Sequence, residues 1–165
     1  MKIIYTISIL FLFCISGYTQ NNDSEKKAVN IIIDSWHEAA SKADFENYFN
    51  LMSENAIFIG TDATENWNKK EFEKYAKPHF DKGKAWSFKS LERNIYFSYD
   101  KKTAWFDELL DTQMKICRGS GVLIKVKNQW KIAHYVLSIS IPNELSNQVI
   151  QLKTDSDNIL IEKLK

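Results

Sequence analysis

Two side chains of opposite charge, Glu108 and Arg118, are the first candidates for chemistry in this sequence. Each lies in a segment whose pattern is typical of a strand. If the two segments pair about a centre near Gln113, Glu108 and Arg118 lie side by side on the inward face. Paired, Glu108 would have a lowered pKa and be inert as a base; unpaired in an apolar pocket, it would have a raised pKa. The pair could equally serve only to fix strand register.

The same pairing supplies two further pocket candidates, Phe106 and Ser120, which it places opposite each other. Ser120 and Arg118 share the phase of the apolar residues that follow them, so we expect both to point inward. A pairing shift of one residue would put Asp107 in place of the glutamate, because neighbouring strand side chains point to opposite faces.

The segment Gly60–Glu65, which follows a predicted buried strand, is the second candidate. Asp62 and Glu65 could supply a carboxylate at the mouth of a pocket, and Trp67 could form part of its wall. Short segments of Thr, Asp and Gly are also ordinary turn chemistry. Both interpretations stay open at this point.

The three histidines are too scattered to form a metal-ligand motif such as His-x-x-x-His, so we expect no metal site. His134 alternates with Ile132 and Val136, which predicts an inward position where it could act as a general base near neutral pH. Tyr135 would take its place as the pocket residue if the strand faces the other way. The alternative role for His134 is a hydrogen-bonded core residue.

The amino terminus has the order of a cleavable signal peptide over residues 1–19. A lysine precedes the uncharged run Ile3–Ile15, which is shorter than the roughly twenty residues of a membrane-spanning helix. Small and polar residues follow, with cleavage expected before Gln20. The sequence therefore predicts an exported protein, periplasmic or secreted, without a membrane span in the mature chain. Loss of Cys14 leaves Cys117 alone, which excludes an intrachain disulfide.

Composition and the absence of certain motifs argue against several classes of function. The formal net charge is +1 and no basic stripe is present, so nucleic-acid binding lacks its electrostatic footprint. No glycine-rich phosphate loop occurs, and Gly119-Ser120-Gly121 lacks the strand–turn–helix context of a nucleophile elbow. We expect no cofactor. Aromatic residues make up 13% of the chain, which favours a large aromatic core or a ring-lined pocket.

The elements that must position these residues are helices first and strands afterwards. Apolar spacing predicts a helix over 24–42, a second beginning at an Asp44 N-cap, and a third that begins at a capping box of Asn68 and Glu71 and is disrupted by Pro78. Strands are predicted over 56–60, 86–99, 103–110, 117–126 and 130–141, with a turn at 127–129 and a short terminal helix over 144–152. This order predicts an α+β fold, a curved antiparallel sheet packed against three N-terminal helices.

Several short segments resemble the SnoaL-like branch of the nuclear-transport-factor-2-like superfamily. They are Trp36-His37, Gly60–Glu65, Trp105–Glu108, Cys117–Val122 and Trp130–Ile132. The resemblance covers about 25–143, which sets the domain, and leaves 144–165 as a terminal helix and tail. It implies a cone-shaped sheet around a pocket that the helices close. Trp36 and His37 on the first helix join the pocket candidates.

Function is not determined by this resemblance, since the superfamily includes isomerases, dehydratases, cyclases, ligand binders and oligomerisation modules. The many rings and the lack of a recognisable catalytic set favour a non-catalytic module that holds a small, largely apolar molecule. A small cofactor-independent lyase or isomerase using Asp62, Glu108 or His134 is the alternative. A module that forms a homodimer through the outer sheet face is the third hypothesis.

Overall fold

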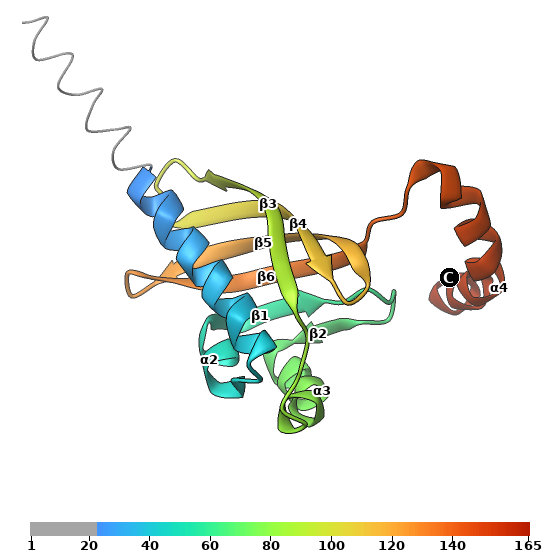
Figure 1. Cartoon of the computed structure of the whole chain (residues 1–165), viewed down its shortest axis with the longest axis horizontal. Helices are drawn as coiled ribbons and strands as arrows, with labels where there is room; N and C mark the ends of the chain where they lie inside the picture. Colours follow the sequence, from blue (N-terminus) through green and yellow to red (C-terminus); the bar gives the residue numbers. More distant parts are fainter. Residues whose placement is uncertain (1–22) are drawn as a thin grey trace, which may run out of the picture.

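The computed structural model describes residues 23–165 (Figure 1). The predicted signal peptide, residues 1–19, lies outside the described residues. A first helix, residues 23–41, crosses one face of the sheet and buries Val29, Ile33 and Trp36 at helical spacing, as predicted. Between residues 23 and 165, no helix combines the length and apolar content that crossing a membrane requires.

Two further helices confirm the predicted caps. The side chain of Asp44 caps α2 (Phe45–Asn50), and the capping box of Asn68 and Glu71 begins α3 (Lys69–Asp81). Pro78 does not end α3, contrary to our expectation: the helix continues to Asp81 although the proline has no N–H to donate. Continuation of the helix buries the following Phe80 among aromatic rings, which offsets the cost of the proline.

Six strands form one sheet in the order β2-β1-β6-β5-β4-β3. All neighbours are antiparallel except β1 and β6, which are parallel. The predicted α+β fold with a curved sheet behind three N-terminal helices is confirmed, with this one parallel pair as the difference. The strands are β1 (Met52–Ile59), β2 (Asn66–Asn68), β3 (Phe88–Phe97), β4 (Thr103–Thr112), β5 (Lys115–Val126) and β6 (Gln129–Ile139).

The predicted pairing of Glu108 with Arg118 is wrong by one residue. β4 and β5 are joined by a two-residue turn between Thr112 and Lys115, so the centre of the hairpin falls between residues 113 and 114. Glu108 consequently pairs with Gly119, and Arg118 lies exposed on the outer face. A centre placed on a residue assumes a loop with an odd number of residues, and that half-residue error moves every partner by one.

Small residues on the inward face of β5 explain why its apolar pattern predicted the wrong inward face. Cys117, Gly119 and Gly121 point inward and are buried, whereas Ser120 points outward and is exposed. A Cβ atom on Gly119 would come within 2.2 Å of the Tyr135 hydroxyl, and one on Gly121 within 2.7 Å of the Phe106 ring. The large side chains of β4 and β6 therefore cover β5. Further along β5, Val122, Ile124 and Val126 share the outward phase of Arg118 and Ser120, whereas Leu123 is buried.

His134 does not point inward, and the bulge beside it gives the reason. The pairing of β5 with β6 jumps from His134 to Ile132, which leaves Ala133 as an extra residue. The extra residue reverses the alternation, so Ile132 and Tyr135 are both buried and His134 is half-exposed on the opposite face. The alternative that we left open, an inward Tyr135, is correct.

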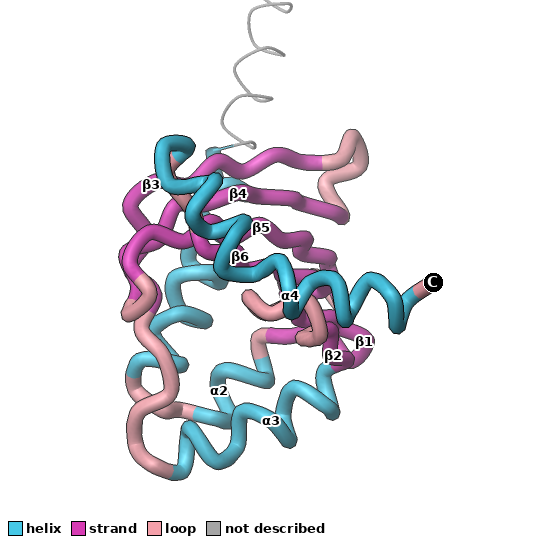
Figure 2. Tube along the Cα trace, turned by 90° about the vertical axis from the view of Figure 1, so that its right-hand side faces the viewer, coloured by secondary structure: helices cyan, strands magenta, loops and turns pink. Residues whose placement is uncertain are grey.

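The carboxyl-terminal segment forms a longer helix than expected. A short 3₁₀ turn (Asn143–Leu145) leads into α4 (Ser146–Leu164), which continues through the part that the sequence left unplaced. Figure 1 shows α4 standing apart from the sheet, and Figure 2 shows it from its exposed side. None of the residues of α4 is buried.

Candidate functional site

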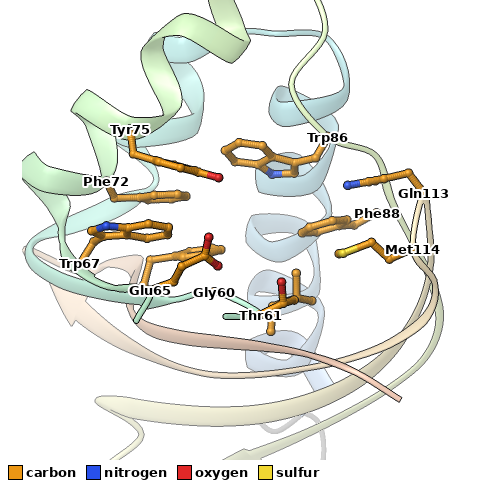
Figure 3. Close-up of a pocket in the computed structure, with 12 residues that line it drawn as sticks. Gly60, Thr61, Glu65, Trp67, Phe72, Tyr75, Trp86, Phe88, Gln113 and Met114 are labelled. Atoms are coloured by element: carbon orange, nitrogen blue, oxygen red, sulfur yellow. The ribbon is translucent and has the colours of Figure 1, made fainter. Parts of the chain in front are cut away.

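A cavity of about 160 Å³ lies where α3, the β1–β2 connection, the beginning of β3 and the β4–β5 turn converge (Figure 3). Most of its wall is aromatic. The residues that line it are Phe58, Gly60, Thr61, Glu65, Trp67, Phe72, Tyr75, Trp86, Phe88, Gln113, Met114 and Leu137.

One wall is a stack of rings from β1, β2 and α3. Phe72 and Tyr75 are three residues apart on α3, so both side chains lie on the face that meets Trp67 of β2. The ring centroids of Trp67 and Tyr75 are 4.4 Å apart, and those of Phe58 and Phe72 are 4.0 Å apart, both stacked. Mutual packing holds these rings in place.

The opposite wall comes from the approach to β3 and the β4–β5 turn. Trp86 and Phe88 face the ring stack across the cavity, with Gln113 and Met114 beside them (Figure 3). The side-chain oxygen of Gln113 accepts a hydrogen bond of 3.4 Å from the backbone N–H of Ser87, which ties the turn to this wall. Segments far apart in the sequence thus form this wall together.

Glu65 brings a carboxylate to the cavity from the loop between β1 and β2. Its Oε2 accepts a hydrogen bond of 3.1 Å from the backbone N–H of Asp62 and lies against Gly60, where an added Cβ would come within 2.1 Å. Burial, followed by the charge of Glu65, raises the pKa of Tyr75. The predicted carboxylate at the pocket is therefore Glu65.

Asp62 behaves as a turn residue. It is exposed, and its Oδ1 accepts hydrogen bonds from the hydroxyl (2.6 Å) and the backbone N–H (2.8 Å) of Thr64. These two bonds lower the pKa of Asp62. Asp62 does not belong to the residues that line the aromatic cavity.

A second cluster surrounds Glu108, which β4 carries to the inside of the sheet with 1% of its surface exposed. The Oε1 atom lies 2.8 Å from Nε2 of His37 on the first helix and accepts a hydrogen bond of 3.0 Å from the Tyr135 hydroxyl of β6. Three elements thus meet at one carboxylate oxygen.

The cation beside Glu108 is Arg93 of β3. Its Nε donates to Oε2 of Glu108 at 2.9 Å, and its Nη2 lies 2.8 Å from the same oxygen. Nη1 donates to Asp34 at 2.7 Å and to Asn30 at 3.1 Å, both on the first helix. Sequence reasoning missed Arg93. The available signal was a polar stripe on the first helix, in which Asn30, Asp34 and His37 follow the spacing i, i+4, i+7.

The electrostatics of the Glu108 cluster keep its carboxylate ionised. Burial raises the pKa of Glu108, but the hydrogen bond and charge of His37 and the charge of Arg93 together outweigh it, so the pKa lies below the ordinary 4.5. Burial, followed by the charge of Glu108, holds the pKa of Tyr135 well above its ordinary value, so its hydroxyl remains a donor. A carboxylate with a lowered pKa and occupied oxygens is poorly suited to proton abstraction.

The comparisons with known proteins agree with this architecture. Residues 29–142 match the family described as the SnoaL-like domain. The chain belongs to this family. No curated protein matches it in a sequence comparison.

Solved structures with the same fold share little sequence with this SnoaL-like domain. A proposed dehydratase of the NTF2-like family from Streptomyces avermitilis superposes with a TM-score of 0.64 at 12% identity, over 73% of this chain and 99% of that one. An NTF2-like protein of unknown function from Pseudomonas putida KT2440 gives 0.61 at 12%, over 74% and 91%. The association domain of C. elegans CaMKII gives 0.58 at 17%, over 71% and 97%. These likenesses show the fold alone.

The predicted site residues of the SnoaL-like domain fall into five places. Of them, Trp67 lines the cavity, and His37 and Glu108 share the buried cluster. Trp36 and Phe106 are buried in the core, and Asp62 caps a turn. Arg118, Ser120 and His134 lie on the outer face, the first two exposed and the third half-exposed. Within residues 23–165, no group of three or more His, Cys, Asp or Glu side chains is arranged to hold a metal ion.

Gly119 allows the Glu108 cluster of the SnoaL-like domain to close. A Cβ at this position would approach the Tyr135 hydroxyl to 2.2 Å and Cγ of Glu108 to 3.0 Å. We expect Gly119→Ala to lower the free energy of unfolding by about 1–3 kcal/mol, the usual cost of overpacking. Urea denaturation of this variant and of Ser120→Ala, its exposed neighbour, measures the effect. Equal stability of the two variants would show that the strand can shift to accept the methyl group.

Proposed function

We propose that this SnoaL-like domain is an exported binding protein that holds a small molecule in its aromatic cavity. One observation carries the proposal: six aromatic side chains from separate elements enclose an open cavity instead of filling it. Close packing is the normal state of protein interiors, and an aromatic-walled cavity with a few polar groups is the usual form of a ligand site.

The size of the cavity limits the ligand. Pockets for drug-sized molecules enclose roughly 300–1,000 Å³, and this cavity has about 160 Å³. A water molecule occupies about 30 Å³ of liquid, so there is room for about five groups of that size. The ligand is therefore a small molecule, or one end of a larger molecule whose remainder lies outside the mouth.

The positions of the residues that we considered for catalysis favour a binding function over a catalytic one. Asp62, Glu108 and His134 do not line the cavity. Glu108 is ionised and held by its partners, and His134 lies on the other face of the sheet. A lyase or isomerase mechanism that depends on these three side chains would have to act away from the cavity.

Dimerisation is the second candidate function. Tyr96 and Trp105 stack on the outer sheet face with centroids 6.0 Å apart, and both are almost half-exposed. Exposed aromatic pairs of this kind are common in protein interfaces. The molar mass of the purified chain in solution distinguishes a monomer from a homodimer.

Export rests on the residue pattern of positions 1–19. Amino-terminal sequencing of the protein recovered from the periplasm or medium should find a new terminus at or near Gln20. Recovery only from the cytoplasm with Met1 retained would contradict it.

The binding proposal predicts that Trp67 contributes more to ligand binding than a tryptophan exposed on the outer face of the sheet. Native mass spectrometry and a thermal-shift screen of small neutral and charged compounds should reveal a co-purifying ligand or a stabilising compound. Trp67→Ala should weaken binding about five- to thirtyfold, since contacts with a ring of the cavity wall are worth about 1–2 kcal/mol. Trp105→Ala on the outer face is the matched control and should bind normally. If wild-type protein carries no ligand and no compound stabilises it, the proposal fails.

A further inference from the structure

The charges around the cavity are of one sign. Glu65 is the one acidic residue in its lining, and the lining contains no Lys, Arg or His. Resting on the function proposed above, we propose that the cavity selects a small organic cation whose nitrogen is covered by methyl groups, such as a trimethylated ammonium.

The rings supply the first part of the attraction. Aromatic faces carry negative partial charge, and a cation within about 6 Å of a ring centroid is attracted to it. Trp67, Phe72 and Tyr75 form one side of the cavity, with Trp86 and Phe88 on the other, and all are seen around the same space in Figure 3. A cation in this space would meet rings on both sides.

Glu65 supplies the second part. Its Oε2 is held by the backbone N–H of Asp62, which fixes the position of the carboxylate. Within residues 23–165, Glu65 forms no salt bridge, and its Oε1 accepts no hydrogen bond. A carboxylate beside apolar rings without a cationic partner is a feature that a ligand cation would complete.

The kind of cation follows from the scarcity of acceptors. A primary ammonium carries three N–H donors, and each needs an oxygen in a site that excludes water. Here the side-chain oxygen of Gln113 already accepts from Ser87. The side-chain oxygens left in the lining are Oε1 of Glu65 and the hydroxyls of Thr61 and Tyr75, and most of the wall is carbon. A methylated ammonium has no such demand, because its surface is carbon while its charge still attracts the rings.

The volume of the cavity fits a methylated ammonium group. Space for about five water-sized groups in a cavity of about 160 Å³ matches one nitrogen and its four carbon substituents. A hydroxyl or carboxyl tail on one substituent would reach the mouth, where Tyr75 is 43% exposed.

A pair of probes separates charge from shape. Choline and 3,3-dimethyl-1-butanol differ in that a neutral carbon replaces the charged nitrogen, so their shapes are nearly the same. Isothermal titration calorimetry with the purified mature chain should show choline or tetramethylammonium bound at least tenfold more tightly than the neutral alcohol. Intrinsic tryptophan fluorescence should change on binding, because Trp67 and Trp86 line the site.

Glu65→Gln tests the carboxylate while keeping its size and its oxygen for the Asp62 N–H. It should weaken choline binding at least tenfold and leave the affinity for the neutral alcohol within about twofold. Glu46→Gln, which makes the same change in charge at an exposed position of α2, is the matched control and should bind as wild type does.

The outcomes separate this inference from the binding proposal. Equal affinity for choline and its neutral isostere, lost in Trp67→Ala, would overturn the cation preference and leave a binding cavity. A ligand from the thermal-shift screen that is anionic or neutral, with no binding of either ammonium probe, would do the same. No binding of any compound, together with no co-purifying ligand, would overturn both proposals.

Discussion

Arg93→Ala is expected to lower the free energy of unfolding by about 3–5 kcal/mol, the cost of removing one partner from a buried ion pair. The Glu108 side chain is fully buried and that of Arg93 is 5% exposed, so water cannot replace the lost guanidinium. Asp34 and Asn30 on the first helix lose the same partner. Denaturation in urea at neutral pH measures the change.

Arg118→Ala is the matched control, because it removes the same side chain from the outer face of the sheet. Exposed substitutions of this kind usually change stability by less than about 0.5 kcal/mol. A large loss in Arg118→Ala, or a small one in Arg93→Ala, would contradict the arrangement of the buried cluster.

Glu108→Gln is expected to lower the free energy of unfolding by about 3 kcal/mol at neutral pH, and the size of this loss should depend on pH. The pKa of Glu108 in the folded protein is below the ordinary 4.5. A lowered pKa means that the carboxylate stabilises the folded state fully above the ordinary value. This contribution is lost as the pH falls below 4.5 through the lowered pKa. The difference in stability between wild type and Glu108→Gln should therefore shrink over that range.

Denaturation of both proteins between pH 7 and the lowest pH at which they remain folded measures this difference. Glu92→Gln makes the same change at an exposed position of β3 and should follow wild type within about 0.5 kcal/mol throughout. A difference between wild type and Glu108→Gln that stays constant as the pH falls would show that ionised Glu108 does not contribute to stability.

The Glu108 cluster and the cavity are connected through packing. The ring of His37 contacts Phe88 of the cavity wall, with centroids 5.6 Å apart, and Tyr135 contacts Phe58 with centroids 5.6 Å apart. Ion pairs and the hydrogen bond of the Tyr135 hydroxyl join the first helix, β3, β4 and β6 behind these two rings. The cluster thus supports two rings of the cavity wall, Phe88 and Phe58, from behind.

Much of the secondary structure could be predicted because its causes are local. Asp44 caps α2, and Asn68 with Glu71 begins α3, since each bonds a backbone group only three residues away. Lys127 and Asn128 both have positive φ angles, as the predicted hairpin turn requires. The order of helices before strands was sufficient to identify the α+β class.

The candidate site could be predicted only in part. The sequence correctly identified Glu108 as inward and Trp67 as a wall residue, and it identified the loop that carries Glu65. It did not identify Arg93 as the partner of Glu108, because that pairing depends on how β3 and β4 are joined. Nor could it show that Trp86 and Phe88 face α3 across a cavity.

What the sequence determined by itself were the elements and their order, because caps, turns and periodicity act over a few residues. What only the tertiary structure decided was register. The even-numbered turn at residues 113–114 and the extra residue Ala133 each move a strand by one position. Since neighbouring side chains of a strand point to opposite faces, one position decides whether a charged residue is buried or exposed. That is why Arg118 and His134 lie outside. The register of β3 against β4 places Arg93 opposite Glu108.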